Sequence, residues 1–545
     1  MDAVLIIGAL TLSPILGFAL GLHWWGVVVS PLLHLAAALT MLWAARPLLR
    51  RDQLWLAGFF FAIQPGVIGY LQFGRPDHHG LLILTSVLYL GAGLRVVTGA
   101  SCPRNTLIMG FVGSFGVWVS IQFLSVLVIP LVALGLFWLA GVRATVPAAR
   151  RLSTGLVVGT AAALALERGW SRLMVQEFDT LSISHLLLFG LTLVFWVGLE
   201  VQQRRCTWPL SLGRRIGIAV LGSGVFLSLL WLLAPDFFAS PLAEVDPLYR
   251  AKRLVLIKEL QPAILFGPDG VWTWSKTVSR PLFWVGISLP ALPWLLYRLR
   301  WGSATERRLY LLLGLGAAVH LPLALNQLRW TPEVAVFLAP VYAALAAALL
   351  DVLVGRLRPA LVPIARPLAT SVLGLWIFIP LGWSLSAARV STSDAEQSAC
   401  RPETLARWLG DPQAAGQTPK HLLVFPDLAP RLLYRTPHAV NAIPNHRSQP
   451  GFAAAIRIMT ATDFTEAAVL LRARGIDAIV TCPGPLEDRL YKVADGEPTL
   501  YRALKKGQPP PFLEPVEASK SQLGGYKVFS VHDETDSSSA AFKFE

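Results

Sequence analysis

The chain has 545 residues, of which 54% are hydrophobic and only 15% are charged, and its mean hydropathy is +0.55. A soluble fold of this length could not bury that much apolar surface, so the composition excludes a water-soluble protein. The net charge of +14 comes mainly from arginines in short segments between apolar runs, without the interleaved aromatics of a strand-binding groove, so we expect no nucleic-acid partner.

The first 390 residues consist mainly of long apolar runs. Runs of roughly 17–22 residues can cross a bilayer as helices whose backbone groups bond internally. The sequence therefore predicts, over residues 1–390, an all-α polytopic membrane domain with about 12–13 transmembrane helices. The first run lacks a basic start and a cleavage site, so we expect it to stay as a helix. The runs lie near 3–22, 27–45, 54–73, 80–98, 107–121, 123–140, 152–168, 184–200, 216–234, 281–297, 309–328, 333–352 and 367–388.

Five arginine-rich loops fall on one face of the membrane if these runs alternate in direction. Such loops are retained in the cytoplasm, so the chain is predicted to be a multi-pass protein of the cell inner (plasma) membrane. The opposite, extracytoplasmic face then carries the loops at 74–80, 167–185 and 236–280 and everything after residue 388. The loops contain Arg46, Arg50 and Arg51; Arg143, Arg150 and Arg151; Arg204, Arg205, Arg214 and Arg215; Arg298, Arg300, Arg307 and Arg308; and Arg356, Arg358 and Arg366.

A segment of ordinary charge density follows, and residues 391–530 are predicted to form an extracytoplasmic, or periplasmic, α/β domain. HLLVF, AIVTC and YKVFSVH have the pattern of short strands, and TEAAVLLRARG that of an amphipathic helix closed by glycine. The polar residues 531–545 are expected to be a disordered tail. Cys400 and Cys482 both lie in this domain, either as a disulfide or as two separate thiols, because sequence does not give their Cα separation.

The segment GRPDHHG at 74–80 contains the sharpest candidate site, at the predicted outer end of two successive spans. Aspartate supplies a hard oxygen ligand and neutral histidine a borderline nitrogen ligand for a divalent metal. Side chains two residues apart in an extended or turn segment face the same way, so we predict Asp77 and His79 as ligands and expect His78 to point elsewhere. The alternative is a solvated hairpin tip without a metal.

Three further residues stand out on the same predicted face. Glu259 in LIKELQP is either a solvated carboxylate or part of a site. Arg329 in LNQLRWTPEV either snorkels to lipid headgroups or offers its planar guanidinium to a phosphate. Asp427 follows the predicted strand HLLVF, where aspartate is usually a turn former.

The order, spacing and predicted sidedness of these features resemble the catalytic subunit of oligosaccharyltransferase, a GT-C type membrane glycosyltransferase. That family carries an acidic metal-binding motif between its third and fourth spans, often Asp-x-His in archaeal members, and Asp77 and His79 match it. A glutamate in the fifth outer loop completes the family's metal site, and Glu259 matches it. Arg329 with Trp330 matches an arginine, beside an aromatic residue, that contacts the lipid-linked pyrophosphate.

The resemblance also covers the soluble domain, with two departures. Phe425-Pro426-Asp427-Leu428-Ala429 stands where the family has Trp-Trp-Asp-Tyr-Gly, which implies that Asp427 lies on the acceptor side. The tryptophan pair that recognises an Asn-x-Ser/Thr acceptor is Phe-Pro here, which argues against asparagine-linked transfer. The family's first outer loop carries an Asp-x-Asp or similar pair, and none precedes Asp77, so either the chain starts at a downstream Met or this member lost the first carboxylate.

The resemblance implies transfer of a sugar from a polyprenyl-phosphate or polyprenyl-pyrophosphate donor to an extracytoplasmic protein or glycan acceptor. Asp77, His79 and Glu259 would hold Mn²⁺ or Mg²⁺, with Asp77 and Glu259 as the catalytic carboxylates. Arg329 and Arg75 would bind the donor phosphate. The alternatives are a non-catalytic relative that binds lipid-linked sugars or acts as a scaffold, and a transporter or flippase, for which no internal repeat is apparent.

Overall fold

The computed structural model describes residues 1–99, 102–205, 210–238, 245–266, 271–379, 400–482, 484–492 and 497–532. The chain divides into two compact units, one made of Met1–Ser240 with Glu259–Ala387 and the other of Pro241–Lys258 with Ala388–Glu545. Residues 241–258 thus join the second unit, which a boundary near residue 390 does not anticipate. Most of the predicted disordered tail, from residue 533 onward, lies outside the described residues.

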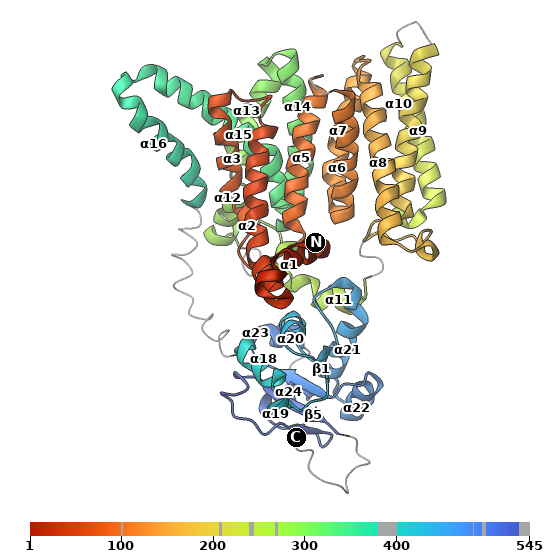
Figure 1. Cartoon of the computed structure of the whole chain (residues 1–545), viewed down its shortest axis with the longest axis vertical. Helices are drawn as coiled ribbons and strands as arrows, with labels where there is room; N and C mark the ends of the chain where they lie inside the picture. Colours follow the sequence, from red (N-terminus) through yellow and green to blue (C-terminus); the bar gives the residue numbers. More distant parts are fainter. Residues whose placement is uncertain are drawn as a thin grey trace. The chain divides into compact units, whose positions relative to one another are not determined.

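The first unit is built of helices (Figure 1). Seven helices in the described residues are long and apolar enough to cross a membrane, and a bent pair, Trp274–Val285 with Ser288–Trp301, gives an eighth. The helices are α1 (Asp2–Leu16), α2 (Phe18–Ala44), α3 (Leu54–Ala62), α4 (Pro65–Ile68), α5 (His79–Val97), α6 (Pro103–Val119), α7 (Leu124–Leu139), α8 (Thr145–Glu167), α9 (Ile183–Arg205), α10 (Leu212–Leu233), α12 (Arg280–Val285), α13 (Ser288–Trp301), α14 (Ala304–Asn326), α15 (Thr331–Arg356) and α16 (Val362–Leu375).

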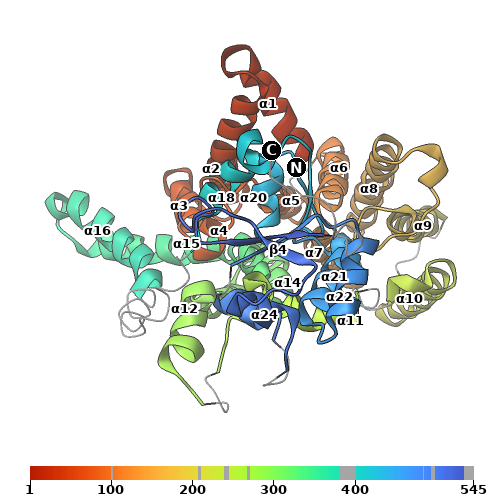
Figure 2. The ribbon, with the colours of Figure 1, turned by 90° about the horizontal axis from the view of Figure 1, so that it is seen from below.

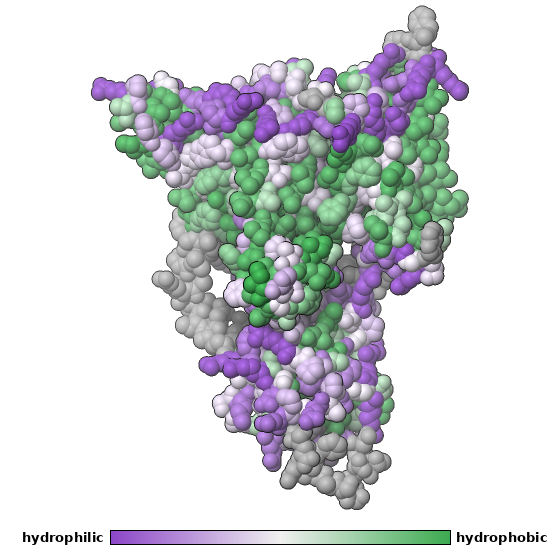
Figure 3. Space-filling model, in the orientation of Figure 1, coloured by the Kyte–Doolittle hydropathy of each residue, from purple (hydrophilic) through white to green (hydrophobic). Residues whose placement is uncertain are grey.

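The surface of this unit is that of a multi-pass membrane protein. Hydrophobic residues cover the flanks of its helices, and hydrophilic residues gather along the upper edge in Figure 3. On α10, for example, Val220, Leu221 and Leu232 are 68%, 71% and 69% exposed. Apolar side chains exposed to this degree along a 22-residue helix are stable in lipid and costly in water.

Several apolar runs fold differently from single spans. The run at 3–22 breaks at Gly17, whose φ of 74° ends α1 after 15 residues, or about 22 Å, too short for a bilayer of about 30 Å. The run at 54–73 divides into α3 and α4 because Pro65 follows an extended Gln64. These breaks are one reason why fewer helices meet the length criterion than the sequence has apolar runs.

Close helix packing in the first unit depends on small residues. A Cβ placed on Gly110 of α6 would lie 2.2 Å from the Leu152 carbonyl, and one on Gly155 of α8 would lie 2.3 Å from the Leu107 carbonyl. Such contacts let two backbones approach, as expected for helix pairs in lipid. Helix α15 is buried along most of its length and packs against α3, α13 and α14, so its first turn is held in the interior.

The second unit is a small α/β domain with a five-stranded sheet of order β2-β1-β3-β5-β4. β1 is parallel to β2 and β3, whereas β5 is antiparallel to β3 and β4. One hydrophobic cluster lies on each face of the sheet. The elements are α11 (Pro247–Lys252), α18 (Pro402–Gly410), α19 (Pro412–Ala415), β1 (His421–Leu423), α20 (Ala429–Arg435), β2 (Ala439–Val440), α21 (Gln449–Thr460), α22 (Phe464–Ala473), β3 (Ala478–Thr481), α23 (Pro485–Leu490), α24 (Leu500–Lys506), β4 (Leu513–Pro515) and β5 (Lys527–Val531).

The strands and helix predicted for this domain are confirmed. HLLVF contains β1, AIVTC contains β3, YKVFSVH contains β5, and TEAAVLLRARG forms α22, which ends before Gly475 with a positive φ of 58°. Cys400 and Cys482 form a disulfide with a Cα separation of 6.3 Å. Helix α11 lies beside α21 in Figures 1 and 2, with the Tyr249 and Phe452 rings 4.9 Å apart.

Candidate functional site

The segment 74–79 folds as a tight turn that leads into α5. Gly74 has a φ of 70°, and its N–H donates a 3.0 Å hydrogen bond to the Val27 carbonyl on α2. The Ser30 hydroxyl, also on α2, donates to the Arg75 carbonyl. His78 then has helical φ and ψ angles as the N-cap of α5. Helix α2 therefore fixes the place at which the Asp-His-His sequence begins.

Asp77, His78 and His79 form one cluster in this turn. The Asp77 Oδ1 atom lies 2.7 Å from His78 Nδ1, and Oδ2 lies 3.1 Å from His79 Nδ1. The prediction that His78 points away is wrong, because His78 already has helical φ and ψ angles and its ring reaches the same carboxylate. Although burial acts to raise the pKa of Asp77, the hydrogen bonds with His78 and His79 hold it well below its usual range.

The cluster fits a divalent metal ion. One ligand atom from each of the three residues lies within 4.8 Å of the others. His79 is only 4% exposed, stacks on the Tyr70 ring at 4.4 Å, and has no well-aligned hydrogen-bond partner at either ring nitrogen. The Nδ1 atom faces the Asp77 carboxylate, whereas Nε2 has no polar partner among the described residues. A buried polar nitrogen without a partner is costly, so coordination of a metal would remove much of that cost.

Glu259 lies beside this cluster rather than within it. The Arg75 Nη2 atom is 3.5 Å from Asp77 Oδ2 and 3.6 Å from Glu259 Oε2, so one guanidinium joins the two carboxylates. Arg75 also donates a 2.7 Å hydrogen bond to the Gly69 carbonyl and lies over the Tyr70 ring. The structure thus brings together Asp77, His79 and Glu259, with Arg75 between the carboxylates and His78 in the ligand group.

Arg329 is held by a residue that sequence reasoning missed. It lies in a 3-10 turn, η9 (Leu328–Trp330), before α15, and its Nε and Nη2 atoms donate to Gln122 Oε1 at 3.1 and 2.6 Å. Gln122 Nε2 donates to Glu333 Oε1 at 3.0 Å. Glu333 is 2% exposed, and its Oε2 atom has no hydrogen-bond partner. The sequence signal that could have identified this residue is the position of the polar Gln122 between two apolar runs.

The charges of the Arg75–Glu259 pair and of the Arg329–Glu333 network both influence the pKa of Tyr70. Burial and the Glu259 and Glu333 carboxylates raise the pKa of Tyr70, which lies in the turn between α4 and α5, whereas Arg75 and Arg329 act to lower it. Coulomb interactions weaken with distance, so these four charged side chains lie near Tyr70.

Backbone hydrogen bonds fix the relative position of two of these segments. The Ala263 N–H donates to the Leu325 carbonyl at 2.9 Å, and the Leu328 N–H donates to the Gln261 carbonyl at 3.0 Å. The chain around Glu259 is therefore attached to the turn that carries Arg329. Residues 62 and 67 positions apart in sequence meet here because the end of α14 and the turn after it bind the returning loop.

Asp427 belongs to the second unit. It lies in the turn after β1, where it pairs with Arg253, whose Nη1 and Nη2 atoms are 3.2 and 2.5 Å from the two carboxylate oxygens. Arg253 is 7% exposed, whereas the Asp427 side chain is 49% exposed. A bidentate pair of this kind orients the carboxylate and leaves its outer edge in solvent.

No protein-family model matches the chain, and no curated protein matches it by sequence. The archaeal oligosaccharyltransferase AglB from Archaeoglobus fulgidus, in complex with an inhibitory peptide and a dolichol-phosphate, matches 87% of this chain with a TM-score of 0.62 and 17% identity. The apo form of the Archaeoglobus fulgidus enzyme matches with the same three values. The chain has an oligosaccharyltransferase-like GT-C fold.

The oligosaccharyltransferase-like fold confirms the architecture that the sequence predicts, and at this identity it shows the fold alone. The chain spans 60% and 61% of the length of these two structures. A complex of the same archaeal enzyme with Zn and sulfate matches at a TM-score of 0.54 and 15% identity, over 87% of this chain and 58% of that one.

Proposed function

We propose that this protein is a membrane glycosyltransferase that moves a sugar or oligosaccharide from a polyprenyl-phosphate or polyprenyl-pyrophosphate donor to an extracytoplasmic acceptor. The observation that carries the proposal is the half-buried Asp77–His79 cluster, which is joined through Arg75 to Glu259 and lies near Arg329. Within an oligosaccharyltransferase-like fold, these groups supply both halves of what the reaction needs: carboxylate and imidazole ligands for a metal, and a cation for a phosphate.

Asp77 and His79, with His78, would hold Mn²⁺ or Mg²⁺, and the imidazoles favour Mn²⁺. The metal, when bound, polarises the sugar–phosphate bond as a Lewis acid. Arg75 keeps the Glu259 carboxylate directed toward Asp77, from where it can complete the ligand set. Arg329 stabilises the negative charge that grows on the departing phosphate, and Gln122 fixes the plane of its guanidinium.

The second unit supplies the acceptor side in this proposal. Asp427 presents a half-exposed carboxylate held by Arg253, and the preceding Phe425-Pro426 replaces an aromatic pair, which favours acceptors other than an Asn-x-Ser/Thr peptide. The proposal places the candidate site and Asp427 on the extracytoplasmic side of the inner membrane. The archaeal structure in complex with a dolichol-phosphate and a peptide supports a lipid-linked donor.

The test is a transfer assay with purified protein, a panel of polyprenyl-phosphate- and polyprenyl-pyrophosphate-linked sugars, and Mn²⁺. Asp77→Ala and Glu259→Ala should each lower the initial rate by about 100-fold or more, since each removes a ligand or a charge at the reacting bond. Asp351→Asn is the matched control, because this carboxylate bonds to Arg50 and Gln53 away from the site. Equal rates in wild type, Asp77→Ala and Glu259→Ala would refute the metal-site mechanism.

One observation favours a second candidate, a non-catalytic protein that binds lipid-linked sugars. The Arg75 guanidinium already neutralises Asp77 and Glu259, so the two carboxylates have a stable arrangement without a metal. A non-catalytic protein would retain labelled donor in a filter-binding assay, transfer nothing under any metal, and lose donor binding in Arg329→Ala but not in Asp77→Ala.

A further inference from the structure

A pocket with two arginines and mainly apolar walls lies at the opposite end of α5 from the candidate site. It has a volume of about 260 Å³ and is bounded by the end of α5 and the start of α8, together with parts of α6, α7 and α14. Helix α5 begins at His79 and ends at Val97, so the pocket and the Asp-His-His cluster are separated by the helix length, about 27 Å. This distance is close to the thickness of the hydrocarbon core.

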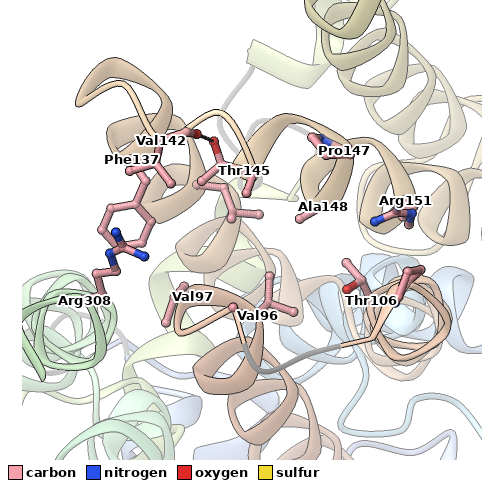
Figure 4. A pocket seen from close by; sticks show the side chains of 14 residues that line it. Val96, Val97, Thr106, Phe137, Val142, Thr145, Pro147, Ala148, Arg151 and Arg308 are labelled. Carbon is pink, nitrogen blue, oxygen red and sulfur yellow. Dashed lines mark hydrogen bonds between the residues drawn. The ribbon is translucent and has the colours of Figure 1, made fainter. Parts of the chain in front are cut away.

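Two arginines supply the charge of this pocket. Figure 4 shows Arg308 at one end, beside the Phe137 ring, and Arg151 at the other end, near Thr106. The Arg308 guanidinium carbon lies 5.8 Å from the centre of the Phe137 ring. None of the fourteen lining residues is acidic, and within the described part of the chain neither arginine lies within ion-pair distance of a carboxylate. Among the residues that the structure describes, the two positive charges of the pocket therefore have no carboxylate counterion.

Neighbouring arginines of the same loops do have partners. Arg150 pairs with Glu200, and Arg298 pairs with Glu306. Arg215 donates to the Leu139 carbonyl at 2.7 Å. Arg151 and Arg308 differ from these three arginines in facing a pocket that has no acidic lining residue.

The remaining walls are apolar. Val96 and Val97 form one side, and Val142 with Ala148 faces them across the pocket (Figure 4). The Thr145 hydroxyl already donates to the Val142 carbonyl, so the arginines are the main donors for an anion. A pocket with cationic ends and apolar walls, at the depth where membrane helices end, matches a phosphate group attached to a hydrocarbon chain. A free phosphate ion would gain nothing from the apolar walls.

We propose that this pocket binds the phosphate headgroup of an anionic membrane lipid, on the face that the arginine loops predict to be cytoplasmic. Its volume is several times the roughly 30 Å³ share of one water molecule, so a headgroup larger than water can enter. The lipid bridges α5, which starts at the Asp-His-His cluster, and α14, which leads into the Arg329 turn. Binding there stabilises the two helices that position the candidate site, whatever reaction that site catalyses.

Native mass spectrometry of the full chain in detergent tests this proposal. We expect phosphatidylglycerol to bind at least about 10-fold more tightly than phosphatidylcholine, since only the former leaves both arginines facing a net negative charge. Arg151→Gln with Arg308→Gln should abolish that preference. Arg143→Gln with Arg307→Gln is the matched control, since it removes the same charge from the same loops at residues outside the pocket lining, and it should leave the preference unchanged.

Two further arms distinguish the source of the phosphate and the effect on folding. Excess inorganic phosphate should not displace the lipid, and displacement would mean that the pocket is a site for a soluble anion. Thermal unfolding without added lipid should be similar in the two double variants, and phosphatidylglycerol should raise the midpoint only where Arg151 and Arg308 are intact. Equal lipid preference in both double variants would overturn the proposal.

Discussion

Gln122 is the most informative single position, because all of its side-chain hydrogen bonds reach residues at the start of α15. Its carboxamide oxygen accepts from Arg329 Nε and Nη2 at 3.1 and 2.6 Å, and its nitrogen donates to Glu333 at 3.0 Å. Gln122→Leu keeps a similar volume and removes these three bonds and a fourth, 3.5 Å long, from Nε2 to the Arg329 carbonyl. Arg329 then keeps its charge but loses the contact that sets the plane of its guanidinium.

The expected effect follows from these bonds. A hydrogen bond to a charged group contributes about 1.5–3 kcal/mol, and water replaces part of it at the half-buried Arg329. A net loss of about 1.5–3 kcal/mol corresponds to roughly 10- to 100-fold in rate. If Arg329 acts on charge that develops at the leaving phosphate, the loss appears mainly in kcat and the donor KM changes little.

The assay measures initial transfer rates against donor concentration for Gln122→Leu, Arg329→Ala and the double variant. Because Gln122 acts through Arg329, the double variant should be no slower than Arg329→Ala alone. Gln176→Leu, which removes an exposed amide bonded to the Leu233 carbonyl, should be neutral. Additive losses in the double variant, or a normal rate in Gln122→Leu, would refute this role for Gln122.

Three other predictions concern metal, redox state and pH. Mn²⁺ at 100 times its Kd should stabilise the wild-type chain against thermal unfolding by about 2.7 kcal/mol and should not stabilise His79→Ala. An equal rise of the unfolding midpoint in both proteins would place the metal elsewhere. The Cys400–Cys482 disulfide closes a loop with a sequence separation of 82, so reducing it should lower the stability of the second unit by about 4.5 kcal/mol in the chain-entropy estimate. Hydrogen exchange in β3 measures this loss, and unchanged exchange would contradict the prediction. Burial raises the pKa of Glu487 to about 7, above its ordinary value of 4.5, so the unfolded state releases this proton first and stability falls as pH rises from about 4.5 to 7. Over that pH range the loss of stability is about 3 kcal/mol. Hydrogen exchange in β3, corrected for its intrinsic pH dependence, measures this loss, and Glu487→Gln should abolish it. An unchanged pH dependence of stability in the variant would assign the loss to another group.

The fold was largely predictable because lipid and sheet each impose a simple pattern on sequence. Apolar runs identify helices in a bilayer, and HLLVF, AIVTC and YKVFSVH identify three of the five strands. The helix breaks at Gly17 and Pro65 were not predicted, because composition alone does not show where a long apolar run changes direction. Helix α11 was not predicted, because the stability of a six-residue helix depends on tertiary packing, which here is the contact of Tyr249 with Phe452.

The candidate site was predictable in its members and less so in its geometry. Asp77 was selected by its ligand chemistry, Glu259 and Arg329 were given their roles by resemblance, and the structure brings the three together near Tyr70. His78 was misjudged because the segment is a turn entering α5. Gln122 and Glu333 were missed because a lone amide or carboxylate in an apolar stretch carries no pattern, and their roles depend on contacts across some two hundred residues.

The path of the chain between its two units has a mechanical consequence. It leaves the first unit after Ser240, contributes α11 to the second unit, and re-enters the first unit at Glu259. Asp427 forms a bidentate ion pair with Arg253, which lies six residues before Glu259 in the sequence. The Asp427–Arg253 pair therefore anchors, within the second unit, the segment of backbone that continues directly into Glu259.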